Sequence, residues 1–401
     1  MTGHINIALV GSKFMGRAHS NAWSKVGRFF DLDVEPVMHT VVARDASEVA
    51  AFAQRWGWQA SSTDWHSVVT ADDIDLVDIG SPNHVHAEQA IAALEAGKHV
   101  ACEKPLAGTL ADAQTMAEAA AVAPGRTFVW FNYRRVPAMS LAHELIRNNA
   151  LGRIYHVRAA YLQDWGGPET PLLWRFQRDI AGSGAHGDLN AHIIDAVRFM
   201  TGEEITAVDG AIEHTFIEER FELTEGVGNA LGGAVGQTKL PSTVDDAVLF
   251  LARLSGGGIA SFEATRLATG YPNANRIEIH GENGAIRIDM GRLNELGYYD
   301  AAADPKTQGW TTIDVTRGEH GHPYVDAWWP SGHGLGYEHT FINQASDTLS
   351  VLGGGVPRVP LPDFEDALRT QQVMHAAILA ARERRPVSIN EVGADTDRSR
   401  G

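Results

Sequence analysis

The first part of the chain alternates short apolar runs with longer stretches whose apolar residues recur at helical spacing. The apolar runs predict strands at residues 4–10, 37–43, 74–79, 99–102 and 127–131, and the amphipathic stretches predict helices at 15–26, 47–56, 83–96 and 110–121. Strands that alternate with helices in this way run parallel and are joined by right-handed crossovers. The pattern therefore predicts an α/β domain over residues 1–132, built on a doubly wound, mostly parallel sheet.

The rhythm changes after residue 150, where runs of strand character follow one another with short connections. The predicted strands are residues 154–163, 206–216, 247–254, 258–265, 276–280 and 285–289. The connections at 256–258 and 282–284 have the composition of hairpin turns. Residues 188–200 predict a helix inside this region. We therefore expect an α+β domain over residues 133–360, with a large open, mostly antiparallel sheet.

Three further segments have their own patterns. Residues 218–243 are glycine-rich and weakly periodic, which predicts a long loop or lid, and residues 302–335 predict a second irregular loop. A long amphipathic helix at 364–382, within a C-terminal segment 361–390, is expected to pack back on the first domain. Residues 391–401 are expected to form a disordered tail.

The charge balance of the chain limits its partners. Lys+Arg minus Asp+Glu is 33 − 50 = −17 over 401 residues, which argues against nucleic-acid and anionic-membrane binding. No apolar run is long enough to span a bilayer, and the N-terminus shows no export signal. Cys102 is the single cysteine, so no internal disulfide can form. We expect a cytoplasmic protein.

A glycine-flanked turn follows the first predicted strand. Gly11 and Gly16 flank Lys13, Phe14 and Met15, and a helix begins here. In dinucleotide-binding turns, the first glycine permits the turn, the last permits close packing of helix on strand, and the helix N-terminus binds a pyrophosphate. Lys13 stands where such turns usually carry a further glycine, and its charge suits a diphosphate. The alternative interpretation is an ordinary strand-to-helix turn.

The ends of the next strands carry the other candidate cofactor contacts. Arg44 and Asp45 follow the second strand, where an acid binds the ribose hydroxyls of NAD and an arginine binds the 2′-phosphate of NADP. These two charged residues do not decide between NAD and NADP as the cofactor, and we slightly favour NAD. The carboxyl ends of later strands add Ser81, Pro82, Asn83, His86, Glu103 and Lys104.

Three residues supply candidate chemistry for hydride transfer at an alcohol. Lys104 follows a strand at the carboxyl edge and precedes Pro105, a position where a cis bond is possible. Asp188 and His192 are four residues apart on a predicted helix and share one face. A lysine polarises an oxygen, a histidine carries a proton, and an aspartate orients the histidine. The alternatives are a charged turn and a helix cap beside a packed histidine; no metal is expected, because no further spaced ligand pair completes a site.

Aromatic and hydrogen-bonding residues flank these positions. They are Tyr133, Arg134, Gln163, Trp165, Trp174 and Arg175, which together with His192 form the candidate substrate contacts. Aromatic rings stack on the C–H faces of sugars, while arginine and glutamine bind hydroxyls. The alternative for each tryptophan is packing in the core.

As an ordered set, the motifs resemble the Gfo/Idh/MocA oxidoreductases over roughly the first 380 residues. The motifs are Gly11–Gly16 with Ala18-His19, Ser81-Pro82-Asn83, Ala96-Gly97-Lys98, Glu103-Lys104-Pro105 and Gly187-Asp188 with His192. The segments 131–135, 161–165, 174–177 and 181–184 are most similar to its levoglucosan-dehydrogenase-like branch. The resemblance implies a Rossmann domain, an α/β domain on a large open sheet, and NAD(P)-linked oxidation or reduction of sugars and cyclitols. It also implies oxidation of a pyranose at C3, with Lys104, Asp188 and His192 as the catalytic residues.

The expected function is therefore an NAD(P)-dependent dehydrogenase acting on a pyranose, anhydrosugar, glycoside or cyclitol. Lys104 would stabilise charge on the substrate oxygen and His192 would accept the hydroxyl proton, although Lys104 could itself be the base. Two alternatives remain: glycoside cleavage or epimerisation through a transient ketone with recycled NAD, and a non-catalytic nucleotide- or sugar-binding sensor. An open sheet face needs covering, which predicts a homodimer or homotetramer.

Overall fold

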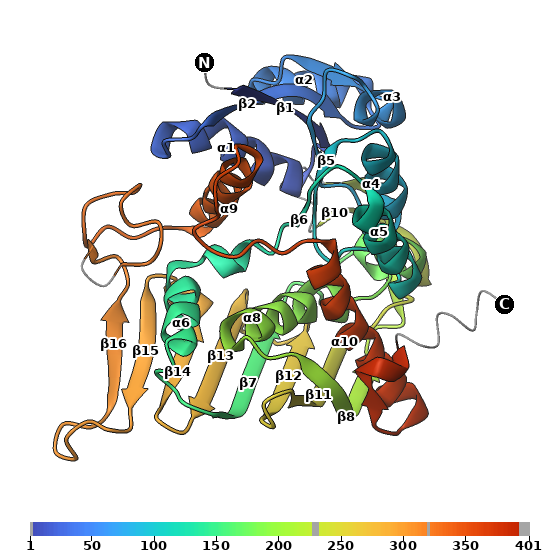
Figure 1. The fold of residues 1–401 in the computed structure, drawn as a ribbon. Helices are drawn as coiled ribbons and strands as arrows, with labels where there is room; N and C mark the ends of the chain where they lie inside the picture. The colour runs from blue at the N-terminus through green and yellow to red at the C-terminus, as the bar shows by residue number, and fades with distance from the viewer. Residues whose placement is uncertain (1–2, 227–231, 319–320, 393–401) are drawn as a thin grey trace. The chain divides into compact units, whose positions relative to one another are not determined.

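The computed structural model describes residues 3–226, 232–318 and 321–392. Its contacts divide the chain into two compact units (Figure 1). The first contains the chain up to Arg135 and Gly336–Leu368, and the second contains Val136–Glu225, Leu231–Leu335 and the chain from Arg369. The expected domain limits stay a prediction; in this grouping Gly336–Leu368 belongs to the first unit, whereas residues 336–360 were expected in the second domain and residues 361–368 in the C-terminal segment. A disordered tail was expected at residues 391–401; Glu391 and Val392 are helical, so the expectation is wrong there, and residues 393–401 lie outside the described residues.

The first unit is built on a parallel sheet. Among the described residues it has six strands in the order β3-β2-β1-β4-β5-β6. The strands are β1 (Gly3–Val10), β2 (Val34–Val42), β3 (Ala60–Ser62), β4 (Leu76–Ile79), β5 (His99–Cys102) and β6 (Thr127–Val129). The order reverses between β1 and β4, which is the switch point where ligands bind in doubly wound sheets. This confirms the predicted fold class.

A helical segment follows each strand of the first unit in sequence, and one further helix comes from later in the chain. They are α1 (Phe14–Phe29), α2 (Ala46–Trp56), α3 (Trp65–Val69), α4 (His86–Glu95), α5 (Leu110–Val122) and α9 (Tyr337–Leu352), with short turns of helix at η1 (Asn83–Val85) and η2 (Asn132–Arg135). Asp45, Asp64 and Thr109 cap the N-termini of α2, α3 and α5 by accepting backbone N–H bonds. α9 groups with this unit because it packs on α1.

The second unit is built on a larger, mostly antiparallel sheet. Among the described residues it has nine strands in the order β16-β15-β14-β13-β7-β12-β11-β8-β17. The strands are β7 (Ile154–Leu162), β8 (Ile205–His214), β11 (Ala247–Leu254), β12 (Ile259–Thr265), β13 (Ala274–Gly281), β14 (Gly284–Asp289), β15 (Glu295–Asp300), β16 (Trp310–Asp314) and β17 (Val387–Ser388). β7 and β12 pair in parallel, and the other pairs are antiparallel. The turns predicted at 256–258 and 282–284 join β11 to β12 and β13 to β14.

Helices cover one face of this sheet. α6 (Pro137–Arg147) and α8 (Ala191–Thr201) pack on each other; α8 also contacts β7 and β13, and α6 contacts β14 and β15 (Figure 1). Shorter helical segments are η3 (Trp174–Phe176), α7 (Arg178–Ala181), the π-helical turn η4 (His186–Asn190) and η5 (Met290–Arg292). α10 (Phe364–Glu383) contacts this unit where the Met374 carbonyl meets His186 and where Arg382 pairs with Glu213. Its expected packing on the first domain stays a prediction.

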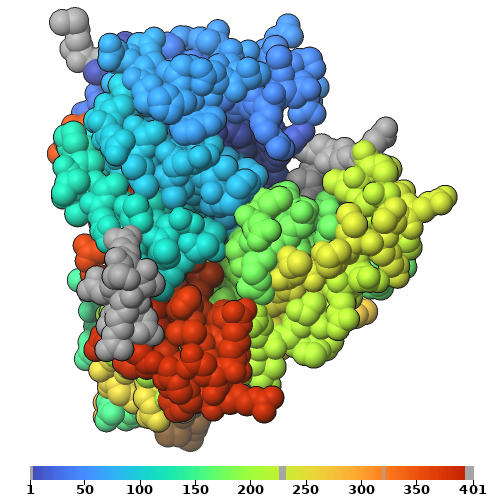
Figure 2. All heavy atoms as spheres, turned by 90° about the vertical axis from the view of Figure 1, so that its right-hand side faces the viewer, coloured from blue at the N-terminus to red at the C-terminus, as the bar shows by residue number. Residues whose placement is uncertain are grey.

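Two predicted loops contain strands. Residues 218–243 form the hairpin strands β9 (Glu219–Gly226) and β10 (Gly233–Pro241), so the predicted loop or lid is wrong outside residues 227–231, which are not described. The glycines of this segment obscure the alternation of apolar and polar residues that is typical of a strand, and Arg220 is a charged residue at a buried position of that alternation. Figure 2 shows the yellow-green atoms of this hairpin at the surface. In the second predicted loop, β16 extends the large sheet.

No helix among the described residues has the length and apolar character needed to cross a membrane.

Candidate functional site

The turn after β1 brings three backbone segments into close contact. Gly11 has a φ of 120°, and a Cβ on it would lie 2.6 Å from the carbonyl oxygen of Gly80. A Cβ on Gly16 would lie 2.2 Å from the carbonyl oxygen of Gly11. Only glycine fits either position, and the turn therefore brings the N-terminus of α1 close to the ends of β1 and β4. This geometry fits the pyrophosphate of a dinucleotide.

The charged residues beside this turn contact each other. Lys13 Nζ lies 2.6 Å from Glu48 Oε2, and both side chains are exposed. Asp45 caps α2 by accepting the Glu48 N–H, and this bond, with the Ser47 hydroxyl, holds the pKa of Asp45 below its ordinary value. Asp45 is therefore an anion at the end of β2, and Arg44 beside it is exposed. The carboxylate there is compatible with the predicted preference for NAD.

His86 joins the loops that follow β4 and β5. It is buried, with Nε2 2.9 Å from the Ser81 carbonyl and Nδ1 3.2 Å from the Leu106 carbonyl. Burial lowers its pKa from the ordinary value, so the neutral ring is favoured. Ser81 Oγ donates to Gln89 Oε1 at 2.7 Å, and Pro82 precedes η1. His86 thus supports the loops around Ser81 and Asn83, and its direct contact with a cofactor stays a prediction.

Glu103 and Lys104 lie directly after β5. The peptide bond from Lys104 to Pro105 is cis, and the Lys104 side chain is partly exposed. Glu103 is buried, where its Oε2 accepts the Lys104 N–H at 3.0 Å and its Oε1 lies 3.1 Å from His19 Nε2. The Glu103 carboxylate therefore supports Lys104 from within the protein. Contact between Glu103 and a cofactor stays a prediction.

His19 lies at the centre of a buried polar cluster that includes Asp78, Glu103, Trp23 and Trp130. Its Nδ1 is 3.0 Å from Asp78 Oδ1, and the indole N–H groups of Trp23 and Trp130 also donate to Asp78. Burial alone would lower the pKa of His19, but the charges and hydrogen bonds of Asp78 and Glu103 outweigh it and raise that pKa to about 9. His19 is therefore an imidazolium at neutral pH.

The candidate sugar contacts of the first unit are buried. Tyr133 packs edge-on against Tyr337, with ring centroids 6.4 Å apart. Arg134 forms an ion pair with Asp366. The predicted contacts of Tyr133 and Arg134 with a sugar stay predictions, and the Asp366 pair gives Arg134 a structural role as well.

In the second unit, Asp188 and His192 lie on consecutive turns of one helical segment. Asp188 belongs to the π-helical turn η4 and His192 to the first turn of α8. Asp245 fixes the start of η4, because its carboxylate accepts hydrogen bonds from the N–H groups of Gly184 at 2.7 Å and His186 at 2.8 Å. His192 is buried, with its ring 5.9 Å from that of Tyr161, whereas the Asp188 side chain is 27% exposed.

Asp188 contacts a buried arginine. Arg266 Nη1 lies 3.8 Å from Asp188 Oδ2, and the Arg266 guanidinium packs over the rings of Trp165 and Phe176. Burial lowers the pKa of Arg266, while the charges of Asp188, Asp245 and Asp246 oppose that shift. Arg266 thus contacts both Asp188, a candidate catalytic residue, and Trp165, a candidate sugar-stacking residue.

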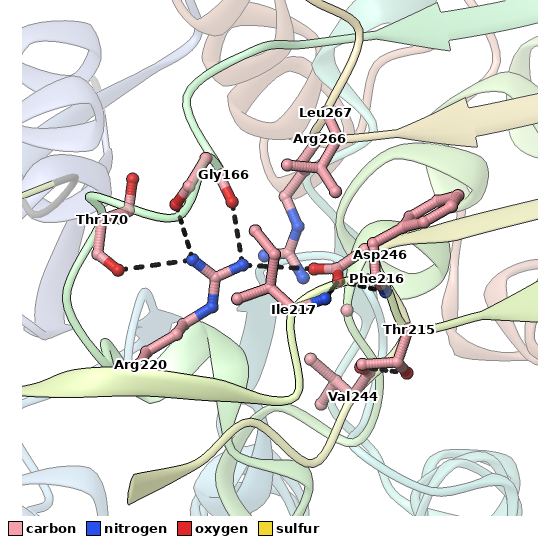
Figure 3. A network of polar contacts seen from close by, with 12 residues as sticks. Gly166, Thr170, Thr215, Phe216, Ile217, Arg220, Val244, Asp246, Arg266 and Leu267 are labelled. Carbon is pink, nitrogen blue, oxygen red and sulfur yellow. Dashed lines mark hydrogen bonds and ion pairs between the residues drawn. The ribbon is translucent and has the colours of Figure 1, made fainter. Parts of the chain in front are cut away.

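A second buried arginine extends this cluster to the β9–β10 hairpin. Arg220 donates to Asp246 at 3.2 Å and to the carbonyls of Gly166 and Gly167 at 2.8 Å (Figure 3). The hairpin is therefore attached to the loop after β7, which carries Trp165.

The remaining candidate sugar contacts lie around this loop. Gln163 Oε1 accepts the Trp165 indole N–H at 2.5 Å, and Gln163 Nε2 donates to Asn273 at 2.8 Å. The Arg175 guanidinium stacks on Trp174 at 4.4 Å, and both side chains are partly exposed. Gln163, Trp165, Trp174 and Arg175 thus belong to one unit with Asp188 and His192, and their binding of a sugar stays a prediction.

Sequence reasoning missed several residues that hold these positions. Arg266, Asp245 and Asp246 went unnoticed, and His19 entered only as part of a family motif, without a role. The available signal was their place in the chain: Asp245 and Asp246 precede β11, and Arg266 follows β12, so paired strands bring them together.

Two family models match the chain. The model described as an oxidoreductase family with an NAD-binding Rossmann fold matches residues 5–131, and the GFO/IDH/MocA C-terminal domain matches residues 139–287. A levoglucosan dehydrogenase from Pseudarthrobacter phenanthrenivorans is 39% identical over 398 residues, which is 98% of this chain and 100% of the relative.

Solved structures agree with these matches. A levoglucosan dehydrogenase in complex with NADH and levoglucosan has a TM-score of 0.89 and 38% identity, covering 97% of this chain and 100% of that one. An oxidoreductase domain protein from Kribbella flavida has a TM-score of 0.89 and 46% identity, again covering 97% and 100%. The predicted family, fold class and nicotinamide cofactor are thus confirmed. This chain belongs to the Gfo/Idh/MocA family and is a nicotinamide-dependent oxidoreductase with an NAD-binding Rossmann fold.

Proposed function

We propose that this chain is a sugar dehydrogenase, which transfers hydride between NAD(P) and a secondary hydroxyl of a pyranose, anhydrosugar, glycoside or cyclitol. The C3 hydroxyl of a pyranose is the favoured position. The observation that carries the proposal is the 39% identity to a levoglucosan dehydrogenase along nearly the whole chain, including the unit that holds Asp188 and His192. The absence of any cysteine but Cys102 is compatible with our assignment of this reaction to the cytoplasm.

The residues act on the substrate in three ways. When bound, the nicotinamide cofactor accepts or donates the hydride. When the alcohol is oxidised, the C–H hydride leaves with its electron pair, and the hydroxyl proton passes to His192 Nε2 or Nδ1. Lys104 stabilises the charge that develops on the substrate oxygen, and the bond from its backbone N–H to Glu103 fixes the main chain that carries its ammonium. Asp188, beside Arg266, remains available to orient the imidazole or to accept a bond from a neighbouring hydroxyl.

The test is nicotinamide fluorescence under turnover. The full chain is mixed with NAD or NADP and with a panel of levoglucosan, pyranoses, glycosides and inositols. We expect reduced cofactor to accumulate with NAD and with at least one sugar. Glycoside cleavage or epimerisation without net NADH release would favour recycled NAD, and tight cofactor binding with no change in any sugar would favour a sensor.

We further propose that a second copy of this chain covers the face of the large sheet that carries the exposed side chains of Ile212 and Leu251. Ile212 on β8 is 64% exposed, and Leu251 on β11 is 59% exposed, on strands that pair directly. Apolar side chains gathered on one sheet face are typical of interfaces between subunits. The wild-type chain is therefore expected to sediment as a dimer or tetramer.

The double variant Ile212→Asp, Leu251→Asp should sediment as a smaller species with a lower sedimentation coefficient. A dimer of this variant would bury four carboxylates in its interface, and their burial would destabilise the dimer. The matched control is Val122→Asp, since Val122 is 86% exposed on α5 of the other unit and should leave the assembly unchanged. A wild-type monomer at micromolar concentration would contradict the proposal.

A further inference from the structure

The cluster around His19 contains a charge that the proposed chemistry does not use. His19 and Asp78 are fully buried, and Glu103 is 4% exposed. A buried charge is costly unless it is paired and hydrogen-bonded. His19 meets this condition at both ring nitrogens, because Nδ1 faces Asp78 and Nε2 faces Glu103. Only the imidazolium can donate to both carboxylates at once.

One side of the cluster fixes the ring of His19. Asp78 lies on β4 and accepts from His19, from Trp23 Nε1 at 2.6 Å and from Trp130 Nε1 at 2.8 Å. The His19 ring also stacks on Trp130, with centroids 4.3 Å apart, and contacts Phe341 of α9 at 5.7 Å. Three donors on one carboxylate and two aromatic neighbours leave the ring one orientation.

The other side of the cluster reaches Lys104. Glu103 Oε1 lies 3.1 Å from His19 Nε2, and Glu103 Oε2 accepts the Lys104 backbone N–H at 3.0 Å. The Glu103 N–H donates to the Ile79 carbonyl at 2.9 Å, so the main chain before Lys104 is fixed to β4. The orientation of the Glu103 carboxylate therefore determines where the main chain of Lys104 lies.

We propose that His19 is a positioning residue for hydride transfer: its imidazolium bridges Asp78 and Glu103, and Glu103 in turn holds the backbone of Lys104. The inference rests on the proposed function, since it takes Lys104 as the residue that stabilises the substrate oxygen. His19 is fully buried, and we assign it no contact with cofactor or substrate. Losing the bridge leaves Lys104 in the chain but misplaced, and a displacement of about 1 Å can cost on the order of 10²-fold in rate.

The bridge depends on pH in a defined direction. The titratable groups that face His19 are Asp78 from β4 and Glu103 after β5, and α1 and α9 present the uncharged rings of Trp23 and Phe341. The pKa of folded His19 is about 9, against about 6.5 in an unfolded chain. Its contribution to stability is therefore complete below pH 6.5 and is lost as the pH rises through 9. Loss of the proton also ends donation to one of the two carboxylates.

The experiment compares His19→Gln and Glu103→Gln with wild type. Stopped-flow hydride transfer is followed from pH 6 to 10 with levoglucosan, or with the panel sugar that gives the largest signal. We expect both variants to lose about 10- to 100-fold in kcat at pH 7. Cofactor affinity should change little in His19→Gln, which replaces no candidate cofactor contact. In wild type, Tm should fall between pH 6.5 and 9, and this fall should be absent in His19→Gln.

Trp23→Phe is the matched control, because it removes one donor to Asp78 and leaves in place the bonds of His19 to Asp78 and Glu103. It should lower Tm and leave kcat and its pH profile as in wild type. If all three variants lower Tm and keep the wild-type kcat and pH profile, the cluster is purely structural and the inference is overturned.

Lys104→Met separates this outcome from failure of the proposed function. If Lys104→Met is inert while His19→Gln and Glu103→Gln turn over normally, the positioning role is wrong and the proposed function stands. Normal turnover in Lys104→Met would instead remove Lys104 from the proposed chemistry and the positioning role with it. Glu103→Gln keeps the shape of the side chain, so it decides the question if His19→Gln fails to fold.

Discussion

Replacing His192 by alanine is expected to reduce kcat by about 10²- to 10⁴-fold, the range over which positioned acid–base groups act. The expected loss arises because the hydroxyl proton then has no imidazole to accept it. The affinity for NAD should remain close to the wild-type value, because His192 lies on α8 of the second unit, whereas the glycine turn belongs to the Rossmann unit. Single-turnover hydride transfer and NADH fluorescence titration measure the two quantities separately.

His192 is buried, so the alanine variant also removes packing beside Tyr161. His192→Asn is therefore the control, since it fills most of the space and cannot accept the proton near neutral pH. Equal losses in both variants assign the effect to proton transfer. Turnover near the wild-type rate in His192→Asn would leave Lys104 as the proton acceptor, which the sequence alone left open.

The first unit was largely predictable because its signals are local. Parallel strands buried on both faces appear in the sequence as apolar runs, as β4 and β5 do. Helix ends are also local: Gly97, at a φ of 78°, directly follows the last turn of α4, where glycine is common because it adopts a left-handed conformation without strain. The motif around Lys104 is local as well, and its position after β5 agrees with the prediction.

The second unit was less predictable because its site depends on charges that are buried by distant partners. Arg220 and Arg266 are fully buried, whereas an arginine in a sequence ordinarily indicates an exposed position. Their partners Asp245 and Asp246 are adjacent to each other, but they meet Arg266 only because β11 pairs with β12. Sequence spacing assigned a shared face to Asp188 and His192, and could not assign Arg266 to the neighbourhood of Asp188.

The largest loss of stability is expected for Arg266→Met, about 3–5 kcal/mol in the free energy of unfolding. The variant keeps much of the side-chain volume but removes the cation beside Asp188 and close to Asp245 and Asp246. Asp246 keeps Arg220, whereas Asp188 loses its ion pair with Arg266 and Asp245 loses the neighbouring charge. Denaturation in urea, followed by circular dichroism, measures the loss.

Arg253→Met is the matched control for this variant. Arg253 pairs with Asp209 at 2.6 Å but is 61% exposed, so its pair is screened by water and should contribute no more than about 1 kcal/mol. The contrast between the two variants tests how burial changes the contribution of an arginine to stability, because each variant removes one guanidinium group from the second unit. Equal losses in the two variants would mean that the three carboxylates near Arg266 are stabilised by other groups.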